Sequence, residues 1–129
     1  MPTIARFEDI EAWKLARTAC NRIYDVSSDG EFSKDFALVN QIRRASVSIL
    51  SNIAEGFERD GNREFIQFLS VAKGSCGEVR SQLYIAFDRG YVDQPAFDEI
   101  FRLLMETSRT LSGFIKYLRQ SDEKGRKFR

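Results

Sequence analysis

Hydrophobic residues recur every three or four positions in four separate segments of the chain. This spacing is typical of amphipathic helices that bury one face. It predicts helices at about 7–26, 33–57, 63–89 and 94–120. The faces expected to be buried contain Phe7, Ile10, Trp13, Ala16, Cys20 and Ile23; Val39, Ile42, Ser46, Ile49, Ile53 and Phe57; Phe65, Phe68, Leu69, Ala72, Cys76, Val79, Leu83 and Ala86; and Phe97, Phe101, Leu104, Ser108, Leu111, Ile115 and Leu118.

Turn and capping residues separate these segments. Residues 27–30, Ser-Ser-Asp-Gly, are expected to end the first helix, and Ser33 to cap the start of the second. Gly56 lies near the end of the second helix, where a glycine C-cap is common. Gly90 is expected to stop the third helix, and Asp93 to cap the fourth.

Four amphipathic helices with short connections predict an all-α fold, an up-down-up-down antiparallel four-helix bundle. The 129 residues suit a single domain over 1–129, with a frayed basic tail at 121–129. Helices of this length span roughly 30–40 Å at about 1.5 Å per residue. The bundle is therefore an elongated rod, whose long side faces suit side-by-side assembly.

The third helix also carries a stripe of small residues, distinct from its apolar face. The stripe consists of Ser70, Gly74, Gly77 and Ser81. Each glycine inside a helix costs about 1 kcal/mol relative to alanine. Close approach of another backbone would offset that cost, whereas the alternative is a locally weak or kinked helix.

The composition excludes several kinds of active site. The chain has no histidine, which removes Ser-His-Asp and Cys-His catalysis, histidine-containing zinc sites and the Glu-x-x-His di-iron site. Cys20 and Cys76 fall on apolar faces and are expected to be buried and reduced. No signal peptide or membrane-spanning run is recognisable, so a cytoplasmic protein without cofactor or metal is expected.

Polar residues line one side of the second and third helices. They are Ser48, Asn52, Glu55, Ser75 and Glu78. One interpretation is that Glu55 and Glu78 form a carboxylate pair for metal binding or acid–base work, but a dinuclear site needs further ligands. The other is a hydrogen-bonded polar seam within or between subunits, and the lack of a nucleophile–base pair favours this assembly seam.

Basic residues are unevenly distributed although the net charge is only +1. Residues 109–129 contain seven basic and two acidic residues, a charge of +5, so the remainder carries −4. The candidate nucleic-acid contacts are Arg43, Arg44, Arg59, Arg63, Lys124, Arg126 and Lys127, with Lys73 and Arg80 further along the third helix. Repeated around an oligomer they would form a basic belt for phosphates. The alternative is a solvated surface, because Glu58, Asp60 and Glu64 lie among them.

Several motifs in the region 41–83 resemble a known family. They are the runs Gln41-Ile42-Arg43-Arg44-Ala45 and Ser48-Ile49, the run Asn52-Ile53-Ala54-Glu55-Gly56-Phe57, and Glu64-Phe65, Phe68-Leu69, Gly74-Ser75 and Glu78. The chain resembles the bacterial four-helix-bundle protein family, which includes proteins encoded in intervening sequences of 23S rRNA genes. The resemblance implies a four-helix bundle that assembles as a ring of five. It also implies kinship with the accessory variability protein of diversity-generating retroelements, a pentameric barrel that binds nucleic acid and a reverse transcriptase.

Together these observations lead to two functional hypotheses. The first is a non-enzymatic scaffold that forms a ring-like homo-oligomer, favoured as a pentamer, and binds RNA, DNA or a protein that handles them. The alternative is a purely structural protein–protein interaction module without nucleic-acid binding. An enzyme is not expected, and no membrane is an expected partner.

Overall fold

The computed structural model describes residues 4–127, and their side chains as far as residue 122. Within that range the chain forms four α-helices and two short 3-10 helices, without a strand. In chain order these are η1 (Phe7–Asp9), α1 (Glu11–Val26), η2 (Phe32–Lys34), α2 (Phe36–Glu58), α3 (Asn62–Asp88) and α4 (Gln94–Lys127). The all-α prediction is confirmed.

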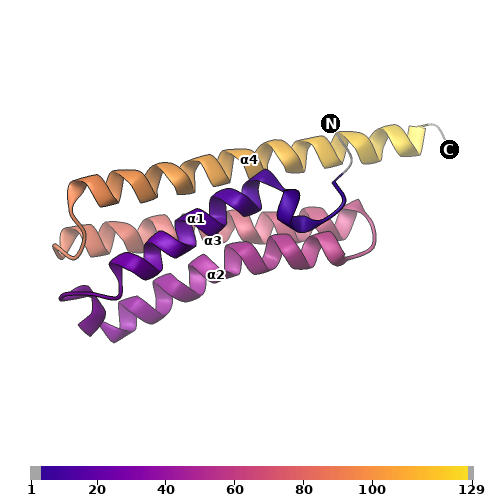
Figure 1. Ribbon diagram of the computed structural model, residues 1–129. Helices are drawn as coiled ribbons and strands as arrows, with labels where there is room; N and C mark the ends of the chain where they lie inside the picture. The colour runs from indigo at the N-terminus through magenta and orange to yellow at the C-terminus, as the bar shows by residue number, and fades with distance from the viewer. Residues whose placement is uncertain (1–3, 128–129) are drawn as a thin grey trace.

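The four α-helices lie along one long axis, and successive helices run in opposite directions (Figure 1). Contacts join α1 to α2, α2 to α3, α3 to α4, and α4 back to α1, so each helix has two neighbours. The α2–α3 hairpin has the most extensive contacts. This is the up-down-up-down bundle that the hydrophobic pattern predicts.

The predicted apolar faces meet in one continuous core. All four helices contribute fully buried side chains, namely Ile23 of α1, Ile42 of α2, Leu69 and Leu83 of α3 and Leu104 of α4. The larger aromatic residues of the same faces pack around this core with part of each ring exposed. Burial of these side chains, at about 1.5–3 kcal/mol for each fully buried one, is the main stabilising term.

The predicted starts of the first two helices need correction. Ile10 is extended, with φ −72° and ψ 123°, so the first segment divides into η1 and α1. The cap of α2 is Asp35 and not Ser33, because the Asp35 side chain accepts a hydrogen bond from the Leu38 amide. Ser33 instead lies in η2 and its hydroxyl donates to the Gly30 carbonyl.

The ends of α3 and α4 differ in how well they follow the prediction. Gly90, at φ +74°, turns the chain after α3, as expected of a C-terminal glycine. The Asp93 side chain accepts from the Ala96 amide and caps α4 as predicted. However, α4 continues to Lys127, so the helix is longer than the predicted end at 120, and the last two residues of the predicted tail lie outside the described residues. No proline interrupts this segment, and basic residues suit a helix C-terminus.

Gly56 has a packing role and not the predicted capping role. It is buried inside α2, where a Cβ atom would lie 2.6 Å from the Phe68 Cβ and 3.0 Å from the Phe65 ring. No side chain larger than hydrogen fits there without displacing α3. Glycine at this position therefore lets α2 and α3 approach closely.

The small-residue stripe of α3 has no close neighbour within the chain. Ser70, Gly74 and Ser81 are exposed and Gly77 is half-buried. A Cβ atom at Gly74 would meet nothing within 4 Å. The stripe thus forms open surface on the single chain.

Candidate functional site

Three of the five predicted seam residues meet between α2 and α3. The hydroxyl oxygens of Ser48 and Ser75 are 3.0 Å apart. The Asn52 amide donates to the Ser48 carbonyl at 2.8 Å and to its hydroxyl at 3.0 Å. Ser75 is buried and the other two are half-buried. The polar seam therefore exists within the chain, as one of the two sequence interpretations proposed.

The two glutamates do not join this cluster. Glu55 accepts a hydrogen bond from Arg59 on the next turn of α2, at 2.9 Å. Glu78 is exposed on α3 and makes no hydrogen bond or ion pair among the described residues. The carboxylate pair is thus absent, and the described part of the chain holds no group of three or more His, Cys, Asp or Glu side chains placed to bind a metal ion.

The seam extends further than the sequence indicated. Gln82, two helical turns after Ser75, is only 7% exposed, and its amide nitrogen lies 3.5 Å from the Gln41 side-chain oxygen. The Gln82 Oε1 atom is buried without a donor among the described residues. In the sequence, Gln82 could have been assigned to the seam from its seven-residue spacing from Ser75, because residues two turns apart share a helix face. A buried amide oxygen without a donor is costly.

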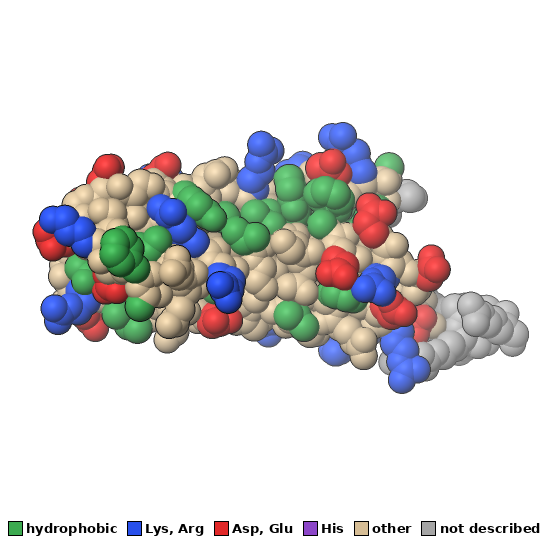
Figure 2. Space-filling view, turned by 90° about the horizontal axis from the view of Figure 1, so that it is seen from below, with side chains coloured by type: hydrophobic (Ala, Val, Ile, Leu, Met, Phe, Trp, Pro, Cys, Tyr) green, Lys and Arg blue, Asp and Glu red, His purple; other side chains and the backbone are tan. Residues whose placement is uncertain are grey.

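Aliphatic side chains are also exposed on the two helices that form the seam. Val71 and Ile85 on α3 are 53% and 48% exposed, and Val47 on α2 is 40% exposed. We call this surface the α2–α3 face and define it by Val47, Val71 and Ile85 together with Glu78, Ser81 and Arg44. The bundle seen from below shows hydrophobic side chains spread among uncharged surface, with charges of both signs scattered around them (Figure 2).

The cations predicted to contact nucleic acid differ in whether they have partners within the chain. Arg43 donates to the hydroxyls of Ser27 and Ser28 at 2.9 and 3.1 Å and lies over the Tyr24 ring. Arg59 pairs with Glu55, whose hydrogen bond raises the pKa of the guanidinium. These two cations are therefore engaged within the chain.

Arg44 and Arg63 remain exposed and make no ion pair among the described residues. They lie on different helices, α2 and α3. The side chains of Lys124, Arg126 and Lys127 lie outside the described residues. A basic belt was expected only around an oligomer, so it stays a prediction, with Arg44 and Arg63 as its exposed cations without an ion pair on the described part of the chain.

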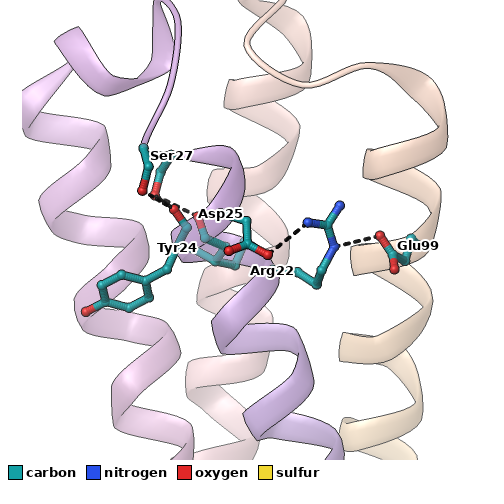
Figure 3. A network of polar contacts seen from close by, with 7 residues as sticks. Arg22, Tyr24, Asp25, Ser27 and Glu99 are labelled. Carbon is teal, nitrogen blue, oxygen red and sulfur yellow. Dashed lines mark hydrogen bonds and ion pairs between the residues drawn. The ribbon is translucent and has the colours of Figure 1, made fainter.

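A second polar network joins α1 to α4. Arg22 donates to Glu99 at 2.9 Å and to Asp25 at 3.1 Å, and the hydrogen bond with Glu99 is the main cause of the raised pKa of Arg22 (Figure 3). Ser27, at the end of α1, donates to the Ile23 carbonyl at 2.6 Å. These contacts fix the end of α1 against the bundle, since Arg22 joins α1 to Glu99 of α4.

Both cysteines are buried, as predicted. Burial raises the pKa of the Cys76 thiol to about 12 and also raises the pKa of Cys20. The thiols are therefore protonated near neutral pH and lack the thiolate character of a nucleophile or metal ligand.

A shallow groove between α3 and α4 was not predicted as a site. It has a volume of about 540 Å³ and is lined by Ser70, Lys73, Gly74, Ser112, Ile115 and Arg119. From the sequence, Lys73 is recognisable only as a cation of the third helix, because placing it opposite Arg119 requires the packing of α4 against α3. No helix in the described residues is long and apolar enough to cross a membrane.

Comparison with known proteins supports the architecture. Residues 8–113 match the family model described as 23S rRNA-intervening sequence protein. A crystal structure from Bacteroides thetaiotaomicron VPI-5482, described as a protein with unknown function from the S23 ribosomal protein family, superposes with a TM-score of 0.75. It is 23% identical, and the match covers 81% of this chain and 95% of that chain. No curated protein sequence matches. The chain belongs to the 23S rRNA-intervening sequence protein family.

Proposed function

We propose that this protein is a non-enzymatic scaffold that assembles with copies of itself through the α2–α3 face. The observation that carries the proposal is the exposure of three aliphatic side chains on α2 and α3, namely Val47, Val71 and Ile85. A second copy on this face would bury all three. Covering half-exposed aliphatic side chains contributes about 1 kcal/mol each.

The shape and charge of the face suit a second copy. Ser81 projects little beyond the helix backbone, so an approaching helix meets only a small side chain at that position. Arg44 on α2 and Glu78 on α3 have opposite charges, and neither has an ion-pair partner among the described residues. In a ring, this face of one copy packs against a different surface of the next copy, because a self-complementary contact closes as a dimer. The arginine and the glutamate are each free to pair with an opposite charge on that surface.

We further propose that the assembly is a ring of five that binds RNA, DNA or a protein that handles them. The alternative function is a purely structural module that contacts another protein and no nucleic acid. Arg63 on α3 is exposed and lies outside the defined α2–α3 face, which favours the first, since assembly leaves this cation accessible. The absence of a nucleophile–base pair among the described side chains supports a role without catalysis.

A charge placed on the proposed interface tests the assembly. In V71E, a carboxylate would have to be desolvated between copies, so the variant is expected to lose its assembled mass in size-exclusion chromatography with light scattering. The matched control is Tyr117→Glu, which puts the same charge on a 39%-exposed side chain of α4, outside the face. Loss of mass in the control alone, or in neither variant, would refute the α2–α3 face as the interface.

A further inference from the structure

The groove between α3 and α4 carries cations on both of its sides. Lys73 projects from α3 and Arg119 from α4, and both are exposed. Ser70, Gly74 and Ser112 lie between them, and none of the six lining residues is acidic. The groove therefore has a positive charge that no lining carboxylate offsets.

Arg80 extends this charge along α3. It lies seven residues after Lys73, about 10 Å further along the helix. One of its terminal nitrogens is 3.7 Å from the position of a Cβ atom at Gly77, so its guanidinium lies over that glycine. Lys73, Arg80 and Arg119 make no hydrogen bond or ion pair among the described residues. Arg22, Arg43 and Arg59, in contrast, are all engaged.

An aromatic cluster follows Arg80 by one helical turn. Tyr84 is 50% exposed, and its ring centroid lies 5.3 Å from that of Phe97 and 5.6 Å from that of Phe101. The two phenylalanines hold the tyrosine ring from the α4 side. The arrangement offers an exposed ring beside a row of free cations.

We propose that the α3–α4 groove binds a single-stranded nucleic acid. Lys73, Arg80 and Arg119 would contact phosphates, while Tyr84 would stack with a base. A positive groove that follows the backbone, combined with aromatic stacking, is how proteins bind single strands without sequence preference. A single strand is favoured over a duplex because only an unpaired base can place its face on Tyr84. This inference rests on the proposed scaffold function and names its partner and contact surface.

The small residues of the groove have a defined part in this proposal. Gly74 and Gly77 leave the space between the cations open, and the serine hydroxyls can donate to phosphate oxygens. An acidic protein segment would form ion pairs with the cations equally well, but its carboxylates would not stack on the aromatic cluster. The nucleic acid therefore accounts for more of the observed surface.

The test is fluorescence anisotropy of a labelled 20-nucleotide oligouridylate over a range of salt concentrations. The double variant Lys73→Gln/Arg119→Gln is expected to bind at least tenfold more weakly than the unmodified chain. The slope of log affinity against log salt should fall by about 1.4, since each lost phosphate contact removes roughly 0.7. Y84L should weaken binding and leave the slope unchanged, because stacking releases no counterions.

The matched control is Lys14→Gln/Arg17→Gln, which removes two exposed cations from α1 on another surface of the bundle. Its affinity should change less than twofold. The inference is overturned if no oligouridylate binds at low salt or if both double variants lose affinity equally. It is also overturned if a duplex of the same length, or polyglutamate of the same charge, competes as well as the single strand.

Light scattering on the same samples separates this inference from the assembly. If a monomeric chain binds the single strand, the proposed self-assembly is refuted and the proposed binding in the groove is supported. If an assembled particle binds no single strand, the proposed binding in the groove is refuted and the proposed self-assembly is supported.

Discussion

At the residue scale, Gly56 shows how one missing side chain determines the distance between two helices. An alanine there would place its Cβ atom 2.6 Å from the Phe68 Cβ. We expect G56A to lower the free energy of unfolding by about 1–3 kcal/mol, the usual cost of overpacking, despite the better helix propensity of alanine. Urea unfolding of G56A and the unmodified chain at one protein concentration measures this difference in the free energy of unfolding.

Gly113 provides the matched control for Gly56. It also lies inside a helix, α4, but a Cβ atom there would meet nothing within 4 Å. G113A is therefore expected to stabilise the protein by about 0.5–1 kcal/mol through helix propensity alone. Equal effects of the two substitutions would contradict the packing role of Gly56.

Cys76 gives the stability of the protein a specific dependence on pH. Its folded pKa of about 12 exceeds that of an exposed thiol, so the folded state binds the proton more tightly. This contribution is fully present below about pH 8.5 and is lost as the pH rises towards 12, at about 1.4 kcal/mol per pH unit. Comparison of urea unfolding at pH 8 and pH 10 should show a smaller decrease for C76A than for the unmodified chain. Equal decreases would mean that Cys76 is not responsible.

At the scale of whole elements, Asp35 joins the start of α2 to the α3–α4 connection. Its side chain accepts from the Leu38 amide at 3.2 Å and from the Tyr91 hydroxyl at 3.0 Å. The Tyr91 ring in turn stacks on buried Phe32 of η2. One carboxylate thus caps a helix and fastens the end of the bundle.

D35A should consequently cost about 1–2 kcal/mol of the free energy of unfolding, from the lost cap and the unpaired tyrosine hydroxyl. Ser33, the cap that the sequence favoured, serves as control, since its hydroxyl bonds only within the loop. S33A is expected to change stability by no more than about 0.5 kcal/mol. Thermal unfolding of both variants decides between the two caps, and a larger loss in S33A would contradict the observed geometry.

Helix faces could be predicted from the sequence, whereas helix ends and contacts between helices could not. Hydrophobic periodicity is local, which is why Ile42 and Leu83 were correctly placed in the core. Ser33 and Asp35 are both good caps, and only the chain path selects Asp35. Gln82 lies against Gln41 of α2, and Arg119 lines a groove with Lys73 of α3. Such pairings depend on helix rotation, which periodicity does not fix.

At the scale of the whole molecule, the rod shape leaves the two proposed surfaces free to act together. The α2–α3 face and the α3–α4 groove share α3 but use different sides of it. Assembly through the face would repeat the groove around the particle. Several weak phosphate sites on one particle bind a long strand far more tightly than one site alone.

The mass of the unmodified protein in solution tests the central claim most directly. Light scattering after size-exclusion chromatography, repeated over a hundredfold range of loading concentration, gives this mass without a label. We predict a particle close to five times the chain mass of 14.9 kDa. An assembly of another size would refute the ring of five, and a particle of 14.9 kDa at every concentration would contradict self-assembly itself.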